Sequence, residues 1–320
     1  MNEKRMALVT IAIVIPLIMI WVAYSGGLLS PNPVISNASQ IDNSTTAQSL
    51  SASQYSTANV VASFFPLYDF ARHVGGNKVN VTTMVPVGVE PHDWEPTTQQ
   101  IQGLLSADLL VYNGAGIDKW ADKIETKLKV NASEGLPLLT DDHRNHDPHT
   151  WLDPLLAKRQ VELIRNGLIK ADPQNTDYYI QNAQAYLDQL DSLDAKIESE
   201  LSTCTKTDFL AFHSAFSYFS NRYGLHQHTI LGEDPEGEIR PQNLERLVNF
   251  AKQYGIHVIY SEDLLDPRNA QVIADEIPNG KVLVLSPIEG VNKDEQNAGI
   301  GYLEKMQQNL ENLKQGLDCK

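Results

Sequence analysis

The sequence predicts an α/β protein of two lobes, each a parallel sheet flanked by helices, with one long rigid helix joining them. Short apolar runs rich in β-branched residues alternate with segments of helical periodicity, first over residues 59–174 and again over residues 204–320. Parallel strands need a crossover between them, usually a helix, so this alternation favours parallel sheets covered by helices. Between the two halves lies a stretch without Gly or Pro.

In the first lobe, breaks in the chain separate the expected elements. Gly75-Gly76 suits a helix end, and Asn113-Gly114 suits a sharp exit from a strand. Another helix is expected to start near Asp153-Pro154. The expected strands are residues 60–64, 79–85 and 109–112, and the expected helices are residues 67–74, 98–106 and 117–128.

The connecting segment, residues 175–203, is expected to form one amphipathic helix. Its apolar positions recur every three or four residues. They are Tyr179, Ala183, Tyr186, Leu190, Leu193, Ile197 and Leu201. A coiled-coil strand is the alternative, but the stripe has fewer than four clean heptads. A continuous helix without a kinking residue resists wide hinge opening, so we expect ligand capture by small movements.

The second lobe repeats the alternation. Its expected strands are residues 209–212, 228–231, 257–261 and 282–285, and its expected helices are residues 215–222, 242–254 and 269–276. The only cysteines are Cys204 and Cys319. Cysteines of an exported chain are more often paired than free, so we expect a bridge, with two reduced thiols as the alternative.

Residues 1–24 indicate a signal or membrane-anchor helix. Lys4 and Arg5 precede an almost uncharged stretch, residues 6–24, close to the ~20 residues that span a bilayer. This charge bias places the rest of the chain outside the cell. Ala23-Tyr24-Ser25-Gly26 is only a fair cleavage site, so an uncleaved anchor is favoured over a secreted form. No cysteine follows the segment closely enough to carry a lipid.

Residues 25–58 are rich in Ser, Thr, Asn and Gln, a composition typical of a disordered stalk. Sequons at Asn37, Asn43, Asn80 and Asn131 fit a glycosylated exterior. The net charge of -15 argues against nucleic acid and against anionic lipid surfaces. The expected partners are therefore cations or proteins.

Three histidines stand where a strand or loop leads into a helix: His92, His149 and His213. Ligands of parallel α/β sheets bind beyond the carboxyl ends of the strands, so these side chains predict a metal site built from distant parts of the chain. Imidazole suits zinc, and also iron, copper and nickel, while manganese prefers more carboxylate oxygen. Three histidines therefore favour zinc.

A fourth ligand is expected from Glu289, which follows the last strand of the second lobe. Glu262, Glu90, Asp93 and water are the alternatives. Trp94 and Trp151, each two residues after a histidine of the set, are expected to pack over the site. The polar loop of Asp141, Asp142, His143, Asn145, His146 and Asp147 either collects a cation loosely or is only solvated.

Catalytic motifs are lacking in the sequence. It contains no His-Glu-x-x-His helix, no Gly-x-Ser-x-Gly elbow and no P-loop, and Asn113-Gly-Ala-Gly116 lacks the third glycine of a dinucleotide loop. A zinc hydrolase would need an open coordination position and a base such as Glu90 or Asp93. We expect a binding protein that is not an enzyme.

With these residues identified, the chain resembles the zinc- and manganese-binding cluster A-I substrate-binding proteins of ABC metal importers, the zinc-uptake type most closely, over residues 60–317. The motifs that carry the resemblance are Phe64-Phe-Pro-Leu67, Pro91-His-Asp-Trp-Glu-Pro96, Asn113-Gly-Ala-Gly116, Asp147-Pro-His-Thr-Trp-Leu-Asp-Pro154, His213 with Ser214-Ala-Phe216-Ser-Tyr218-Phe219, and Pro287-Ile-Glu-Gly290.

This resemblance implies an extracytoplasmic receptor, expected to be a monomer, that binds Zn²⁺ between two lobes and passes it to an ABC permease driven by a cytoplasmic ATPase. It implies His92 and His149 as ligands and His213 as the third ligand of zinc-type members. Glu289 lies close to a position where some members supply a carboxylate. Manganese or iron as cargo, and a surface adhesin with structural zinc, are the alternatives. The long His-rich loop of many zinc-type relatives is reduced here to His143 and His146.

Overall fold

The computed structural model describes residues 57–140, 145–231 and 241–320. Within these residues, eight strands form two parallel sheets of four strands each. The expected α/β class with two lobes is therefore confirmed. The lobe boundaries, residues 59–174 and 204–320, stay a prediction.

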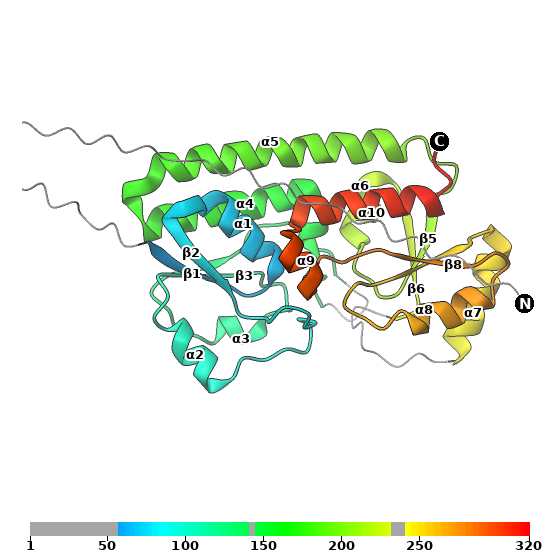
Figure 1. Ribbon diagram of the computed structural model, residues 1–320, viewed down its shortest axis with the longest axis horizontal. Coiled ribbons are helices and arrows are strands. Elements are labelled where there is room, and N and C mark those ends of the chain that lie inside the picture. The colour runs from blue at the N-terminus through cyan, green and yellow to red at the C-terminus, as the bar shows by residue number, and fades with distance from the viewer. Residues whose placement is uncertain (1–56, 141–144, 232–240) are drawn as a thin grey trace, which may run out of the picture. The chain divides into compact units, whose positions relative to one another are not determined.

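The first sheet has the strand order β2-β1-β3-β4. Helices α1 and α4 cover one face and α2 and α3 lie on the other (Figure 1). The strands are β1 (Ala58–Ala62), β2 (Val79–Thr83), β3 (Leu109–Tyr112) and β4 (Lys129–Asn131), and the helices are α1 (Phe65–Gly75), α2 (Thr98–Leu104), α3 (Lys119–Asp122) and α4 (Pro154–Ala171).

The second sheet repeats this topology with the order β6-β5-β7-β8. In both sheets the chain starts in an inner strand, moves to one edge and returns past its starting point. The strands are β5 (Asp208–Ala211), β6 (His226–Thr229), β7 (Val258–Ser261) and β8 (Lys281–Val284), and the helices are α6 (Ser217–Tyr223), α7 (Pro241–Tyr254), α8 (Arg268–Asp275), α9 (Lys293–Ala298) and α10 (Tyr302–Gly316).

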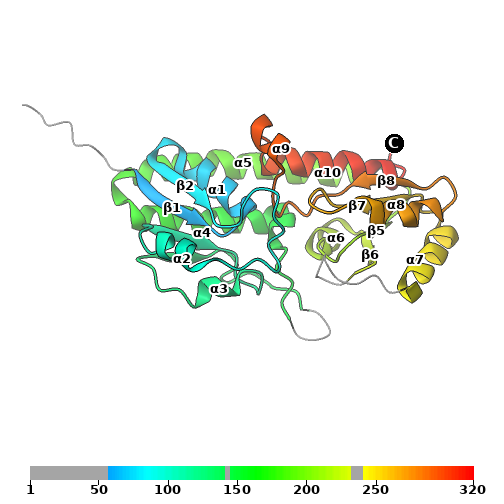
Figure 2. The same cartoon turned by 60° about the horizontal axis from the view of Figure 1, so that its bottom comes forward.

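The long helix α5 (Thr176–Leu201) runs along both lobes (Figures 1 and 2). It packs against α1 and α4 of the first lobe and against α6 and α10 of the second. Every residue of the predicted apolar stripe is buried, and so is Leu187. Because one apolar face covers elements of both lobes, the two sheets share a continuous hydrophobic core.

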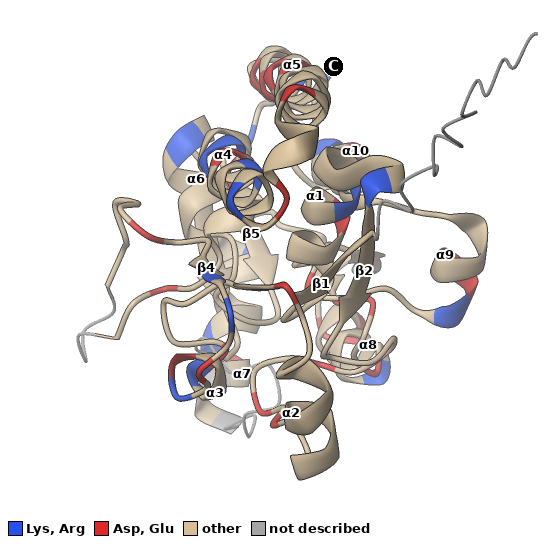
Figure 3. Cartoon of the chain, turned by 90° about the vertical axis from the view of Figure 1, so that its left-hand side faces the viewer, with Lys and Arg blue, Asp and Glu red and all other residues tan. Residues whose placement is uncertain are grey.

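Most charged residues lie on the helices and loops around the sheets. Strands β1 and β2 carry no charged residue, whereas α4 and α9 carry both signs (Figure 3). A parallel sheet covered on both faces must bury its side chains, which explains the apolar runs in the sequence.

The structure also corrects the expected elements. The helix expected over residues 117–128 is shortened to α3, residues 119–122. The Lys129 ammonium donates to the carbonyl oxygens of Ala121, Asp122 and Ile124, which satisfies carbonyl groups that would otherwise be unpaired at the end of a short helix. Strand β4 and helices α9 and α10 were not predicted. The expected bridge between Cys204 and Cys319 is present.

The N-terminal predictions, an anchor over residues 1–24 and a stalk over residues 25–58, concern residues that lie almost entirely outside the described part of the chain, as do Asn37 and Asn43. Among the residues that the structure describes, no helix is long and apolar enough to cross a bilayer. Asn80 is exposed and Asn131 is half-buried, with its side-chain oxygen accepting from the Ser133 N–H. Glycosylation of these two asparagines stays a prediction.

Candidate metal centre

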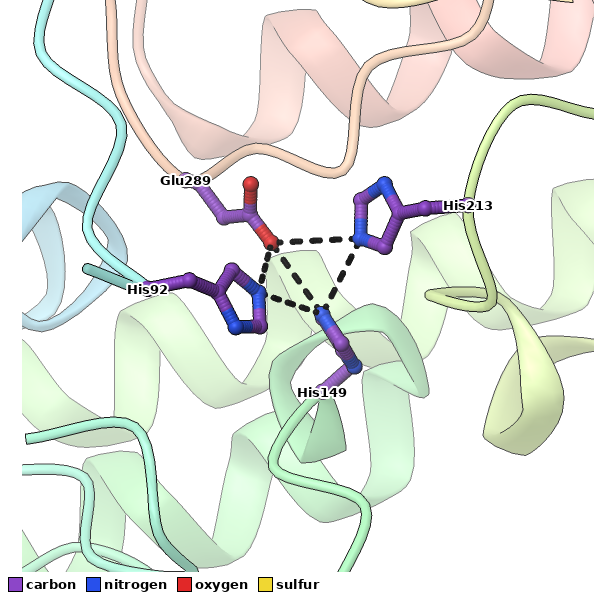
Figure 4. Close-up of side chains that lie close together, drawn as sticks. All are labelled: His92, His149, His213 and Glu289. Atoms are coloured by element: carbon purple, nitrogen blue, oxygen red, sulfur yellow. Dashed lines mark hydrogen bonds and ion pairs between the residues drawn. The ribbon is translucent and has the colours of Figure 1, made fainter. Parts of the chain in front are cut away.

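Four side chains from both lobes converge on one point. His92 lies on the loop between β2 and α2, His149 directly precedes the turn into α4, His213 follows β5, and Glu289 follows β8. One potential ligand atom from each residue lies within 4.8 Å of all the others (Figure 4). The structure thus brings together the three histidines and the carboxylate that the sequence singled out.

His149 is held by the residues around it. The Asp147 carboxylate accepts from the backbone N–H of His149 at 3.0 Å and lies 2.8 Å from its Nδ1. After the short turn Thr150–Leu152, Asp153 caps the N-terminus of α4 by accepting from the Leu155 N–H. With its Nδ1 occupied by Asp147, His149 directs its Nε2 to the centre.

The Asn113-Gly-Ala-Gly116 motif supports the same segment. The buried Asn113 amide donates to the Pro148 carbonyl at 3.0 Å, next to His149. Asp118 accepts from the N–H groups of Asn113 and Gly114, and burial raises the pKa of Asp118 to about 6. Gly114 has φ +72, and a Cβ there would lie 2.5 Å from the Asn131 side chain. The motif is therefore structural.

His213 and Glu289 belong to the second lobe. The Nδ1 of His213 lies 2.6 Å from Glu262 Oε1, and both residues are buried. Glu289 follows Ile288, which is buried with φ +59, a left-handed conformation that is strained for a β-branched residue. The backbone is thus held in an unusual conformation at the residue that precedes the carboxylate.

Five of the six separations between the ligand atoms are 3.1 to 3.7 Å, close to those around a tetrahedral ion, and the sixth, between His92 and His213, is within 4.8 Å. Glu289 Oε1 lies 3.2, 3.1 and 3.7 Å from the Nε2 atoms of His92, His149 and His213. The His149 Nε2 lies 3.3 Å from the Nε2 of each other histidine. Ligand atoms at about 2.0 Å from a tetrahedral zinc ion are separated by about 3.3 Å.

Carboxylates make this centre favourable for positive charge. Burial by itself lowers the pKa of His213, but Glu262 and Glu289 raise it to about 10. Burial likewise opposes the raised pKa of His149, which Asp147 and Glu289 cause. Burial alone would raise the pKa of Glu289, yet the surrounding imidazoles hold it well below its usual range. A bound cation can take the place of these protons.

Exposure at the centre is uneven. The His92 side chain is 14% exposed, whereas those of His149, His213 and Glu289 are at most 1% exposed. His92 is therefore the most accessible of the four side chains. On the same loop, Glu90 accepts from the backbone N–H of His92, and burial followed by the charge of Glu289 raises the pKa of Glu90 to about 9.

The alternative ligands are placed differently. Glu262 contacts the outward Nδ1 of His213 and not the central point, and Asp93 is exposed. Trp151 is fully buried with its ring 5.2 Å from the His149 ring, but Trp94 packs against Trp120. Residues 141–144 of the polar loop lie outside the described residues.

The contacts of two carboxylates with the histidines were not predicted from the sequence. Asp147 and Glu262 orient His149 and His213, a role that carboxylates commonly take behind metal-binding histidines. Asp147 stands two residues before its histidine, and this local spacing could have indicated the contact. Glu262 is 49 residues from His213 and carries no comparable signal.

A comparison with protein-family models identifies the family of this chain. The family model described as "Zinc-uptake complex component A periplasmic", ZnuA, matches residues 60–316. The chain belongs to the ZnuA family. This confirms the resemblance drawn from the sequence motifs.

Relatives within the ZnuA family are named for zinc. The chain is 36% identical over 282 residues to the high-affinity zinc uptake system protein ZnuA of Bacillus subtilis, covering 82% of this chain and 88% of the relative. It is 33% identical to the zinc-binding protein AdcA of Streptococcus pyogenes, covering 80% of this chain. The chain spans only 55% of the length of that relative.

A solved structure supports the fold of this ZnuA-family chain. The Zn(II)-bound ZnuA-like domain of Streptococcus pneumoniae AdcA matches with a TM-score of 0.74 and 32% identity, covering 82% of this chain and all of that domain. The two-lobed arrangement is thus shared with a domain that was crystallised with zinc.

Proposed function

We propose that this protein is an extracytoplasmic receptor that captures Zn²⁺ between its two lobes and delivers it to an ABC importer. The observation that carries the proposal is the convergence of His92, His149, His213 and Glu289 from both lobes, with ligand atoms within 4.8 Å of one another. Membership of a zinc-uptake family agrees with it. We assign these four side chains as the ligands.

The charge at the site is suited to a divalent ion. Three neutral imidazoles and the Glu289 carboxylate leave one positive charge on bound zinc. Asp147 and Glu262, each one imidazole away from the ion, more than offset that charge and strengthen their histidines as ligands. Because the histidines must lose their protons, zinc binding releases protons and weakens as the pH falls.

A transport role explains why the ion is enclosed. The family is a transport family, and four protein ligands leave no coordination position for a reactive water. We therefore propose that the protein is not an enzyme. Since α5 packs on both lobes and opposes wide opening, release requires the permease to move the loop that carries His92. Anchoring through residues 1–24 remains part of the proposal.

Metal titration of the purified protein tests this function. One Zn²⁺ per chain is expected to compete with a chromogenic chelator, with poor replacement by Mn²⁺. His213→Ala should lose tight binding. His228→Ala is the matched control, because His228 lies in β6 and is hydrogen-bonded to Asp208. Absence of zinc binding, or equal binding by both variants, would refute the proposal.

The same preparation separates a receptor from an adhesin with structural zinc. A receptor whose lobes share a continuous core should stay folded after chelation of the metal, whereas a structural zinc should be required for folding. Circular dichroism with and without a chelator distinguishes the two. Preferential binding of manganese or iron would instead indicate a different cargo for the same site.

A further inference from the structure

We infer that the buried Lys305 is a positioning residue that holds the second-lobe part of the metal site, Glu289 and His213, in its binding geometry. This inference rests on the proposed function. Lys305 lies in the first turn of α10 and its side chain is 1% exposed. Its ammonium contacts the Asp263 carboxylate and lies 2.9 Å from Glu295 Oε1. Lysine is rarely buried to this extent unless it is paired.

One branch of contacts leads from Lys305 to Glu289. The Asp263 oxygen that meets the ammonium also accepts from the Ser286 hydroxyl at 2.9 Å. That hydroxyl in turn accepts from the Ile288 N–H at 3.0 Å. An unbroken chain of hydrogen bonds thus connects the lysine to the residue that precedes the proposed carboxylate ligand.

Helix α10 makes a second set of contacts with the segment that leads to Glu289. Asn309, one turn after Lys305, accepts from the Ser286 N–H at 2.8 Å and donates to the Ser286 carbonyl at 2.6 Å. Both backbone groups of Ser286 are therefore fixed on α10. The face of α10 that carries Lys305 and Asn309 thus fixes Ser286, three residues before Glu289.

Backbone strain explains why this support is needed. Ile288 has φ +59, a left-handed conformation that is unfavourable for a non-glycine residue and persists only where the surroundings impose it. Without the hydrogen bond to its N–H, Ile288 would relax towards a negative φ. Glu289 is the next residue, so relaxation would carry its carboxylate away from the imidazoles.

A second branch leads from Lys305 to His213. Asp263 directly follows Glu262, whose carboxylate lies 2.6 Å from His213 Nδ1. Fixing Asp263 therefore restrains the residue that orients this imidazole. A buried ion pair is a weak source of stability because of its desolvation cost, which makes a positioning role the better account of Lys305.

The test compares Lys305→Met with a matched control, Lys206→Met. Lys206 contacts the Gly255 carbonyl, Asp318 and His257, which lie at the end of the lobe that carries the disulfide. The readouts are zinc affinity by chelator competition and the visible spectrum of the Co²⁺-loaded protein. The spectrum reports the ligand geometry around the ion at saturation, which a loss of global stability alone does not change.

Lys305→Met is expected to bind zinc about tenfold or more weakly, as for supporting residues of other metal sites, with an altered cobalt spectrum. Lys206→Met should match the wild type in both. A folded Lys305→Met protein with wild-type affinity and spectrum would overturn the inference.

If Lys305→Met does not fold, Ser286→Ala decides instead, because it removes only the hydroxyl that links Asp263 to Ile288. Weaker zinc binding by Ser286→Ala supports the inference and wild-type binding overturns it. Failure of the wild-type protein to bind zinc would refute the proposed function and this inference together, whereas wild-type zinc binding with unchanged variants overturns the inference alone.

Discussion

Replacing Glu262 by glutamine should weaken zinc binding by a factor that grows with pH. The substitution keeps the size of the buried side chain and removes its charge 2.6 Å from His213 Nδ1. The carboxylate favours zinc on the far nitrogen of the imidazole, and loss of such a partner typically costs about 10–100-fold in affinity. It equally favours a proton on His213, which competes with zinc.

The competition can be worked out from the pKa of His213. With Glu262 present this pKa is raised to about 10, so zinc must displace a proton at neutral pH. Each pH unit below a raised pKa weakens binding about tenfold, or about 1.4 kcal/mol. Between pH 7 and pH 9 the wild type should therefore gain about a hundredfold in affinity from this one group. In Glu262→Gln the pKa is lower, so the gain is smaller.

The assay is competition against a chelator of known zinc affinity at pH 7 and pH 9. We expect Glu262→Gln to bind about 10–100-fold more weakly than the wild type at pH 9, and the two proteins to differ much less at pH 7. Glu276→Gln, a substitution at an exposed carboxylate, is the control. Equal ratios of affinity at both pH values would refute the reasoning, because they would mean that Glu262 does not hold a proton on His213.

Three further predictions concern stability. The raised pKa of His213 stabilises the metal-free protein fully below the unfolded pKa near 6.5, and this stabilisation is lost as the pH rises towards 10. Urea unfolding in the presence of a chelator should therefore show that the free energy of unfolding falls by about 2–3 kcal/mol from pH 7 to pH 9. A constant unfolding midpoint would contradict this prediction. Replacing Cys204 and Cys319, which are 115 residues apart, by serine should lower the free energy of unfolding in urea by about 2–5 kcal/mol. The zinc affinity should not change. Trp151→Phe removes a 2.7 Å hydrogen bond to the Pro287 carbonyl. We expect the free energy of unfolding to fall by about 1–3 kcal/mol and zinc binding to weaken. An unchanged unfolding midpoint would show that this carbonyl finds another donor.

Local patterns predicted the elements with the strongest periodicity. The absence of Gly and Pro and the apolar stripe from Tyr179 to Leu201 predicted α5 to within two residues at each end. Helix α10 carried a similar stripe in Tyr302, Met306, Leu310 and Leu313, and could have been predicted in the same way. The end of α3 could not be predicted, because it depends on the Lys129 side chain reaching back to three carbonyl groups.

The sequence by itself determined which side chains were candidates for a metal site. Imidazole and carboxylate groups that follow strands of parallel sheets are recognisable without coordinates, since strand alternation and side-chain chemistry are local properties. This was sufficient to select His92, His149, His213 and Glu289. It left Glu262 open as an alternative fourth ligand, since Glu262 and Glu289 both follow strands of the same sheet.

Only the tertiary structure decided that the four ligand atoms meet within 4.8 Å, and that Glu289 faces the centre while Glu262 stands behind His213. The relative position of the lobes depends on contacts between residues far apart in the chain, such as the Trp151 indole donating to the Pro287 carbonyl. The direction of each carboxylate depends on how its strand end packs. These long-range contacts leave no periodic pattern in the sequence, and they bring two sets of strand ends together at the candidate metal centre.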